Sequence, residues 1–143
     1  MLKYIRFNNT KRKTAKIEWV SAPDIEKKIA SLIKNLDIHW VKKENIVSVR
    51  SFNANTRAIA RIWGLGRIWQ IALSVEPKYI IEVVSEKFDR LDDREQNKVL
   101  LHEIAHIPKN FSGSLVAHTR KGKNSFKGKL DTLVAQYMRY LMK

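Results

Sequence analysis

The sequence predicts a single α+β domain with an N-terminal helix, a three- to four-stranded and mostly antiparallel sheet, a helix in the second half of the chain and a C-terminal helix. Three observations predict this class. Apolar residues recur at helical spacing near the N-terminus, four short runs rich in β-branched and aromatic residues follow, and two further helical patterns end the chain. At 143 residues the chain has the length of about one domain.

The first helix is predicted over residues 23–36. Pro23 and Asp24 are typical of a helix start. The apolar residues that follow share one helical face: Ile25, Ile29, Leu32, Ile33 and Leu36. An amphipathic helix of this kind packs its apolar face on another element, so we expect it to lie on the sheet.

Four runs supply the candidate strands of that sheet. They are residues 45–52, 58–65, 67–74 and 79–85. Gly64 and Gly66 flank Leu65 between the second and third runs, which predicts a tight hairpin there. We expect Trp63 and Trp69 to pack on a sheet face, because aromatic residues at strand spacing usually serve a core.

The segment RLDDREQNKVLLHEIAHIP, residues 90–108, predicts the next helix. Asp92 is a candidate N-cap with Glu95 three residues later, and acidic residues suit the positive end of the helix dipole. Pro108 ends the helix just beyond Ile107.

This helix carries the pattern HExxH. His102 and His106 are four residues apart, so both imidazoles lie on one helical face and can reach one zinc ion. Glu103 lies beside that position, where its carboxylate can accept a proton from an activated water. The pattern predicts a zinc hydrolase with Glu103 as the general base.

A catalytic zinc site usually has a third protein ligand. We expect His118, because the loop before it holds Gly113, which can turn the chain back, and no acid lies between Glu103 and Asp131. Asp131 is the alternative ligand, or a carboxylate that orients an imidazole. We expect it to start the final helix, whose apolar stripe includes Tyr137, a candidate oxyanion donor.

Basic residues are concentrated in two blocks. The chain has 28 Lys and Arg against 14 Asp and Glu, a formal net charge of +14, and no acid occurs in residues 1–17 or in residues 104–130. Such a field attracts nucleic acid, an anionic membrane surface or an acidic protein. The candidate DNA- or RNA-binding residues are Lys11, Arg12, Lys13, Arg120, Lys121 and Lys123.

Cysteine is absent, so thiolate ligands and disulfides are excluded and a reducing compartment fits. The N-terminal residues form no apolar stretch of signal-peptide length, and no segment approaches the roughly twenty apolar residues of a membrane span. The expected location is the cytoplasm. We divide the chain into a basic N-terminal segment, residues 1–20, and one domain, residues 21–143.

The run LLHEIAHIPKNFSG, residues 100–113, followed by His118, resembles phage and archaeal metallopeptidases, which are small zincin-like domains. More distantly it is similar to SprT-like proteases. The resemblance implies a zincin-like α+β fold and a bound Zn²⁺. It also implies that His102 and His106 are ligands, that Glu103 is the catalytic acid and base, and that His118 is the third ligand.

Two classes of function fit the sequence. The first is a zinc-dependent metallopeptidase that acts on a protein or peptide substrate, near nucleic acid if the basic blocks recruit it. The second is a basic nucleic-acid-binding protein whose zinc is structural or vestigial.

Overall fold

A computed structural model describes residues 15–143 as one mixed domain of helices and a four-stranded sheet. The elements in chain order are β1 (Glu18–Ser21), α1 (Pro23–Asn35), the 3₁₀ turn η1 (Lys43–Asn45), β2 (Ile46–Phe52), β3 (Ala60–Gly64), α2 (Arg67–Leu73), β4 (Tyr79–Val84), α3 (Ser85–Phe88), α4 (Asp93–Ala105) and α5 (Phe126–Leu141). The α+β class predicted from the sequence is confirmed.

The sheet has the strand order β1-β2-β4-β3. Both outer pairings, β1 with β2 and β3 with β4, are antiparallel, whereas the central pairing of β2 with β4 is parallel. The sheet is therefore mostly antiparallel, as predicted. β3 pairs with β4 alone among the described strands, so its other edge is free.

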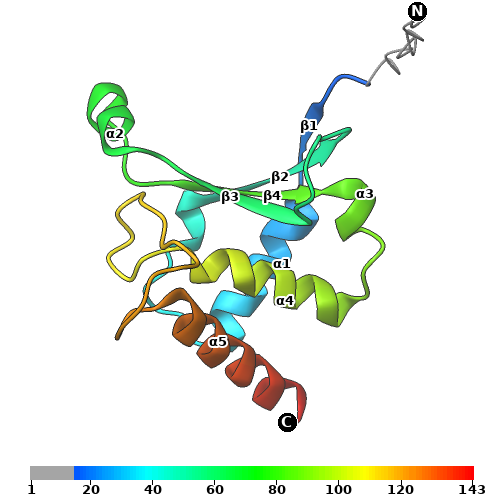
Figure 1. The fold of residues 1–143 in the computed structure, drawn as a ribbon, viewed down its shortest axis with the longest axis vertical. Helices are drawn as coiled ribbons and strands as arrows, with labels where there is room; N and C mark the ends of the chain where they lie inside the picture. Colours follow the sequence, from blue (N-terminus) through cyan, green and yellow to red (C-terminus); the bar gives the residue numbers. More distant parts are fainter. Residues whose placement is uncertain (1–14) are drawn as a thin grey trace, which may run out of the picture.

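The helices α1, α4 and α5 lie on one side of the sheet, and α2 projects from one end of it (Figure 1). The helix-facing side chains of β4, Tyr79, Ile81 and Val83, are fully buried with Leu100 and Ile104 of α4. α5 packs on α4 and lies farther from the sheet. This core fixes α4 beneath β3, which places the last turn of α4 next to the free edge.

α1 forms where it was predicted. Pro23 stands in the first turn, where its missing N–H costs nothing, and Asp24 and Glu26 suit the positive end of the helix dipole. Ile25, Ile29 and Leu32 are buried, as their helical spacing predicted.

Residues 67–74 were predicted to be a strand, and this is wrong: they form α2 after Gly66. β4 already has a neighbour on each side, β2 and β3, so a strand here would have no edge of β4 to join. The predicted hairpin around Leu65 is therefore absent. Trp63 and Trp69 are 50% and 59% exposed, so neither belongs to the core.

β1 was not predicted. Its four residues are all exposed, so the strand lacks the alternation that marks a half-buried strand. β1 also spans residue 20, where we placed the end of the basic N-terminal segment.

The last helix starts at Phe126 and not at Asp131, because the Ser125 hydroxyl caps it by accepting from the backbone N–H of Gly128.

Residues Lys11, Arg12 and Lys13 lie outside the described part of the chain. Over residues 15–143, no helix has the length and apolar character needed to cross a membrane.

Candidate metal centre

α4 is capped as predicted and carries the first two histidines at its C-terminal end. The Asp92 carboxylate accepts a hydrogen bond of 2.9 Å from the backbone N–H of Glu95. Leu100, Leu101 and Ile104 anchor the opposite face in the core. The helix ends at Ala105, and His106 is its C-cap, so the HExxH residues occupy its last turn.

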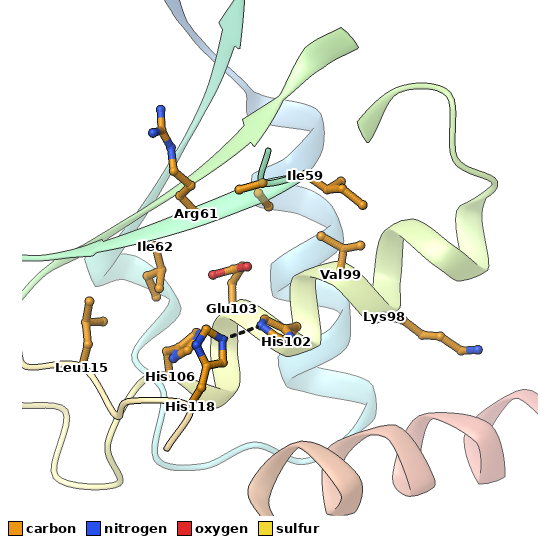
Figure 2. Close-up of a pocket in the computed structure, with 12 residues that line it drawn as sticks. Ile59, Arg61, Ile62, Lys98, Val99, His102, Glu103, His106, Leu115 and His118 are labelled. Atoms are coloured by element: carbon orange, nitrogen blue, oxygen red, sulfur yellow. Dashed lines mark hydrogen bonds between the residues drawn. The ribbon is translucent and has the colours of Figure 1, made fainter. Parts of the chain in front are cut away.

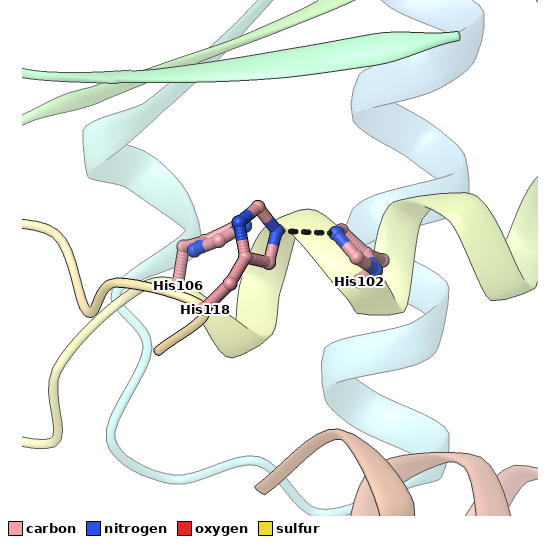
Figure 3. Close-up of side chains that lie close together, drawn as sticks. All are labelled: His102, His106 and His118. Carbon is pink, nitrogen blue, oxygen red and sulfur yellow. Dashed lines mark hydrogen bonds between the residues drawn. The ribbon is translucent and has the colours of Figure 1, made fainter. Parts of the chain in front are cut away.

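The structure brings three histidines together (Figure 3). One nitrogen from each of His102, His106 and His118 lies within 4.8 Å of the other two, so the group could hold a metal ion. The Nε2 atoms of His102 and His118 are 3.1 Å apart. The ring of Phe126, the first residue of α5, stacks on His106 with centroids 4.3 Å apart.

His106 is oriented by the loop that leads to His118. Its Nδ1 lies 2.6 Å from the backbone oxygen of Val116, and because a carbonyl can only accept, Nδ1 carries the proton and Nε2 is left as a lone-pair donor. The Val116 N–H in turn donates to the His106 oxygen, over 2.7 Å. These two bonds tie the loop to the end of α4.

The surroundings favour neutral imidazoles. Burial lowers the pKa of His102, and its neighbours His106 and His118 lower it further. Burial also lowers the pKa of His106, against the opposing effect of its bond to Val116. The neutral form is the one that ligates a metal, so His102 and His106 are suited to binding.

Glu103 lies next to the histidines and points toward β3 (Figure 2). Glu103 is 7% exposed, and burial raises its pKa to about 7. A carboxyl group with such a pKa can both accept and return a proton near neutral pH.

A cavity of about 600 Å³ opens between β3 and α4, bordered by Glu103 and the three histidines (Figure 2). Its other walls are mostly apolar. They include Ile59, Ile62, Val99 and Leu115. The cavity can therefore receive an apolar side chain beside the three histidines.

A comparison with protein families shows to which family the chain belongs. Residues 17–130 match the family described as "Putative phage metallopeptidase". The chain belongs to this family. Comparisons with curated proteins and with solved structures gave no match. The match spans the sheet, α4 and the loop with His118, so it includes the whole candidate centre of this metallopeptidase family member.

The other predicted site residues lie elsewhere. Asp131 is exposed on α5 and is not part of the histidine group. Tyr137 is buried, and its hydroxyl accepts from the side-chain amide of Asn97 over 3.0 Å, away from the metal cavity. Arg120, Lys121 and Lys123 are exposed on the loop that follows His118.

Two residues that hold the metal-site loop were not singled out from the sequence. The Tyr79 hydroxyl accepts from the Gly113 N–H at 2.8 Å and donates to the Ser114 oxygen at 2.9 Å. The Gln70 amide donates to the backbone oxygens of Leu65 and Ser112. Tyr79 and Gln70 each contact the loop from a segment distant in the sequence, so no local pattern indicated these contacts.

Gly64→Ala is expected to lower the free energy of unfolding by roughly 2 to 3 kcal/mol. A Cβ at Gly64 would overlap the backbone oxygen of Gly113, so strand and loop must separate. Gly66→Ala is the control, because its Cβ would meet nothing closer than 3.7 Å, and the lost glycine cap should cost less than about 1 kcal/mol. Urea unfolding followed by circular dichroism measures both. Equal stabilities for the two variants would contradict the close packing of β3 on this loop.

Proposed function

We propose that this protein is a zinc-dependent metallopeptidase that hydrolyses peptide bonds, with Glu103 as the general base. The observation that carries the proposal is the convergence of three imidazoles beside a buried carboxylate at the wall of a cavity. Membership of a metallopeptidase family supports it.

The donor set fits zinc. Three neutral imidazoles are a known zinc ligand set that leaves a coordination position open. His102, His106 and His118 would hold the ion, and the His106–Val116 bond would keep that ring in the ligating tautomer. When bound, zinc supplies Lewis acidity, which lowers the pKa of a water molecule and polarises a carbonyl oxygen.

Glu103 moves the proton. Its carboxylate accepts a proton from the attacking water while the water oxygen bonds to the peptide carbon. It then delivers that proton to the amine nitrogen as the C–N bond breaks. Burial keeps its pKa near neutrality, so both transfers are accessible at the same pH.

The substrate would lie extended along the free edge of β3. Main-chain hydrogen bonds to this edge would hold the peptide, and one side chain would enter the cavity. Ile59, Ile62 and Leu115 make that cavity apolar, so we propose a preference for an apolar residue next to the cleaved bond.

We also propose, from the positive charge of the chain, that the enzyme acts near nucleic acid in the cytoplasm. The formal charge of +14 supports nucleic-acid recruitment, and the lack of cysteine fits a reducing compartment. The alternative is a nucleic-acid-binding protein with a structural or vestigial zinc. The exposed Arg120, Lys121 and Lys123, close behind His118, are the observation that favours it.

Cleavage of a mixture of unstructured peptides tests the proposal. The zinc-loaded protein should cut beside apolar residues, a chelator should stop it, and added zinc should restore it. Leu115→Asn should lower kcat/KM for apolar peptides by roughly tenfold, since one apolar contact is worth about 1 to 3 kcal/mol. Leu73→Asn on α2, outside the cavity, is the control. A wild-type protein that holds zinc and cuts no peptide would favour the binding-protein alternative.

A further inference from the structure

Two further hollows, apart from the cavity beside the histidines, lie between the loop that follows α4, Trp40 and the start of α5. One has a volume of about 440 Å³ and the other about 270 Å³. They adjoin, because Lys109, Asn124 and Lys129 line both of them. None of these residues borders the metal cavity.

Cations converge on these hollows. Lys109, Arg120 and Lys129 line the smaller hollow, and no acid lines it. Lys123 joins Lys109 and Lys129 around the larger one, where Asp37 is the one acidic residue. Among residues 15–143, these four cations form no ion pair. These cations therefore have no salt-bridge partner among the described residues.

Lys129 is held at the centre of this group. Its ammonium donates to the backbone oxygen of Ile107 and lies 4.4 Å from the centroid of the Trp40 ring. Burial lowers its pKa to about 8, and the nearby Lys109 and Arg120 contribute to that lowering. The fold thus keeps a half-buried lysine beside two like charges, an arrangement that a bound anion would stabilise.

Neutral donors complete the lining. The side-chain amides of Asn110 and Asn124 border the smaller hollow, and within the described residues neither has a hydrogen-bond partner in the protein. Phosphate oxygens accept hydrogen bonds from lysine, arginine and amide donors together. A carboxylate ligand would fit less well, because its two oxygens lie in one plane, whereas phosphate oxygens point in tetrahedral directions.

We propose that the two hollows form a phosphate-binding seat, in which Lys109, Arg120 and Lys129 hold the phosphate groups of a polyanion. The exposed Lys121 and Lys127 extend the positive charge beyond the seat, which favours a chain of phosphates such as a nucleic-acid backbone over a single free phosphate. The nucleic-acid source rests on the proposed function, whereas the seat itself is independent of peptidase activity. Val116 lines the smaller hollow and also orients His106, so the seat and the metal centre share one loop.

The test follows the indole N–H signal of Trp40 by ¹⁵N NMR in the full chain. The chain has four tryptophans, and Trp40→Phe identifies the signal. Titration with inorganic phosphate, at ionic strength held constant with chloride, should move the Trp40 signal and leave those of Trp19, Trp63 and Trp69 in place. Equal movement of all four signals, or movement of none, would overturn the seat.

Matched variants locate the binding. Lys109→Gln/Arg120→Gln, both exposed, should weaken phosphate binding at least tenfold, and Lys129→Met should do the same if it folds. Lys27→Gln/Arg94→Gln, on α1 and α4, removes the same charge from exposed positions outside both hollows and should change binding less than twofold. Equal losses in the two double variants would overturn the seat and leave only a general effect of net charge.

A labelled oligothymidylate, measured by fluorescence anisotropy against salt, distinguishes the source of the phosphate. A nucleic-acid ligand predicts that Lys109→Gln/Arg120→Gln makes the plot of log affinity against log salt less steep by about 1.4, since each of two lost contacts contributes about 0.7 on a single strand. An unchanged slope with weakened inorganic phosphate binding supports the seat for a small phosphate compound and contradicts nucleic acid as its ligand. Neither result depends on zinc or on peptide cleavage.

Discussion

Glu103→Gln is expected to keep bound zinc and to lower kcat for peptide hydrolysis by roughly a hundredfold or more. Glutamine has nearly the size of glutamate, so the last turn of α4 and its histidines should stay in place. It cannot accept the proton of the attacking water, which is the step we assign to Glu103. Metal analysis and a peptide cleavage assay on the same preparation measure the two quantities together.

Glu95→Gln is the matched control for this variant. Glu95 is on the same helix, in its first turn, and its side chain is 53% exposed. This variant should cleave peptides at the wild-type rate. Wild-type activity in Glu103→Gln would exclude the carboxylate as the base, and zinc loss in that variant would assign it to metal binding instead.

The metal-free protein offers a readout of Glu103 that is independent of catalysis. The pKa of Glu103 is raised from 4.5 to about 7 in the folded state. Between pH 4.5 and about pH 7, the folded state therefore binds more protons than the unfolded state. Stability contributed by Glu103 is therefore present at low pH and lost as the pH rises from 4.5 to about 7. The amide introduced by Glu103→Gln cannot titrate, so the stability difference between wild type and this variant, measured by urea unfolding, should change across this range.

The sequence predicted the parts of the site that depend on local structure. The i, i+4 spacing put His102 and His106 on one face of α4, and the Asp92 cap fixed where that helix begins. The buried face of α1 was also predicted, because its apolar residues recur at helical spacing in the sequence. Each of these features is set by residues within one or two helical turns of one another.

Apart from the approach of His118 to the other two histidines, the features that depend on distant contacts were not predicted. Residues 67–74 have strand-like composition, yet they form α2 because β4 already has two neighbours, which is a property of the whole sheet. Phe126 stacks on His106 only after α5 packs on α4. Lys109 and Lys129 are far apart in the sequence, so their convergence on shared hollows required the folded chain.

His118→Ala is expected to weaken zinc binding by roughly a hundredfold or more, because it removes one of the three ligands that we propose. The same loss is expected for His102→Ala and His106→Ala. His118 is exposed on a loop, so its replacement tests the ligand set with little effect on α4. Competition with a zinc-binding dye measures the affinity, and the wild-type protein should hold about one zinc per chain.

Two controls separate ligation from nonspecific binding. His39→Ala should keep wild-type zinc affinity, because that exposed imidazole lies 3.0 Å from Asp37 and outside the group of three. Asp131→Ala should also keep it, since the exposed carboxylate is absent from the group. Zinc retained in His118→Ala but lost in Asp131→Ala would replace the histidine with the aspartate as third ligand.

Because a ligand that binds only the folded state stabilises it, zinc should also raise the melting temperature of wild type and of both controls, but not of His118→Ala at the same zinc concentration.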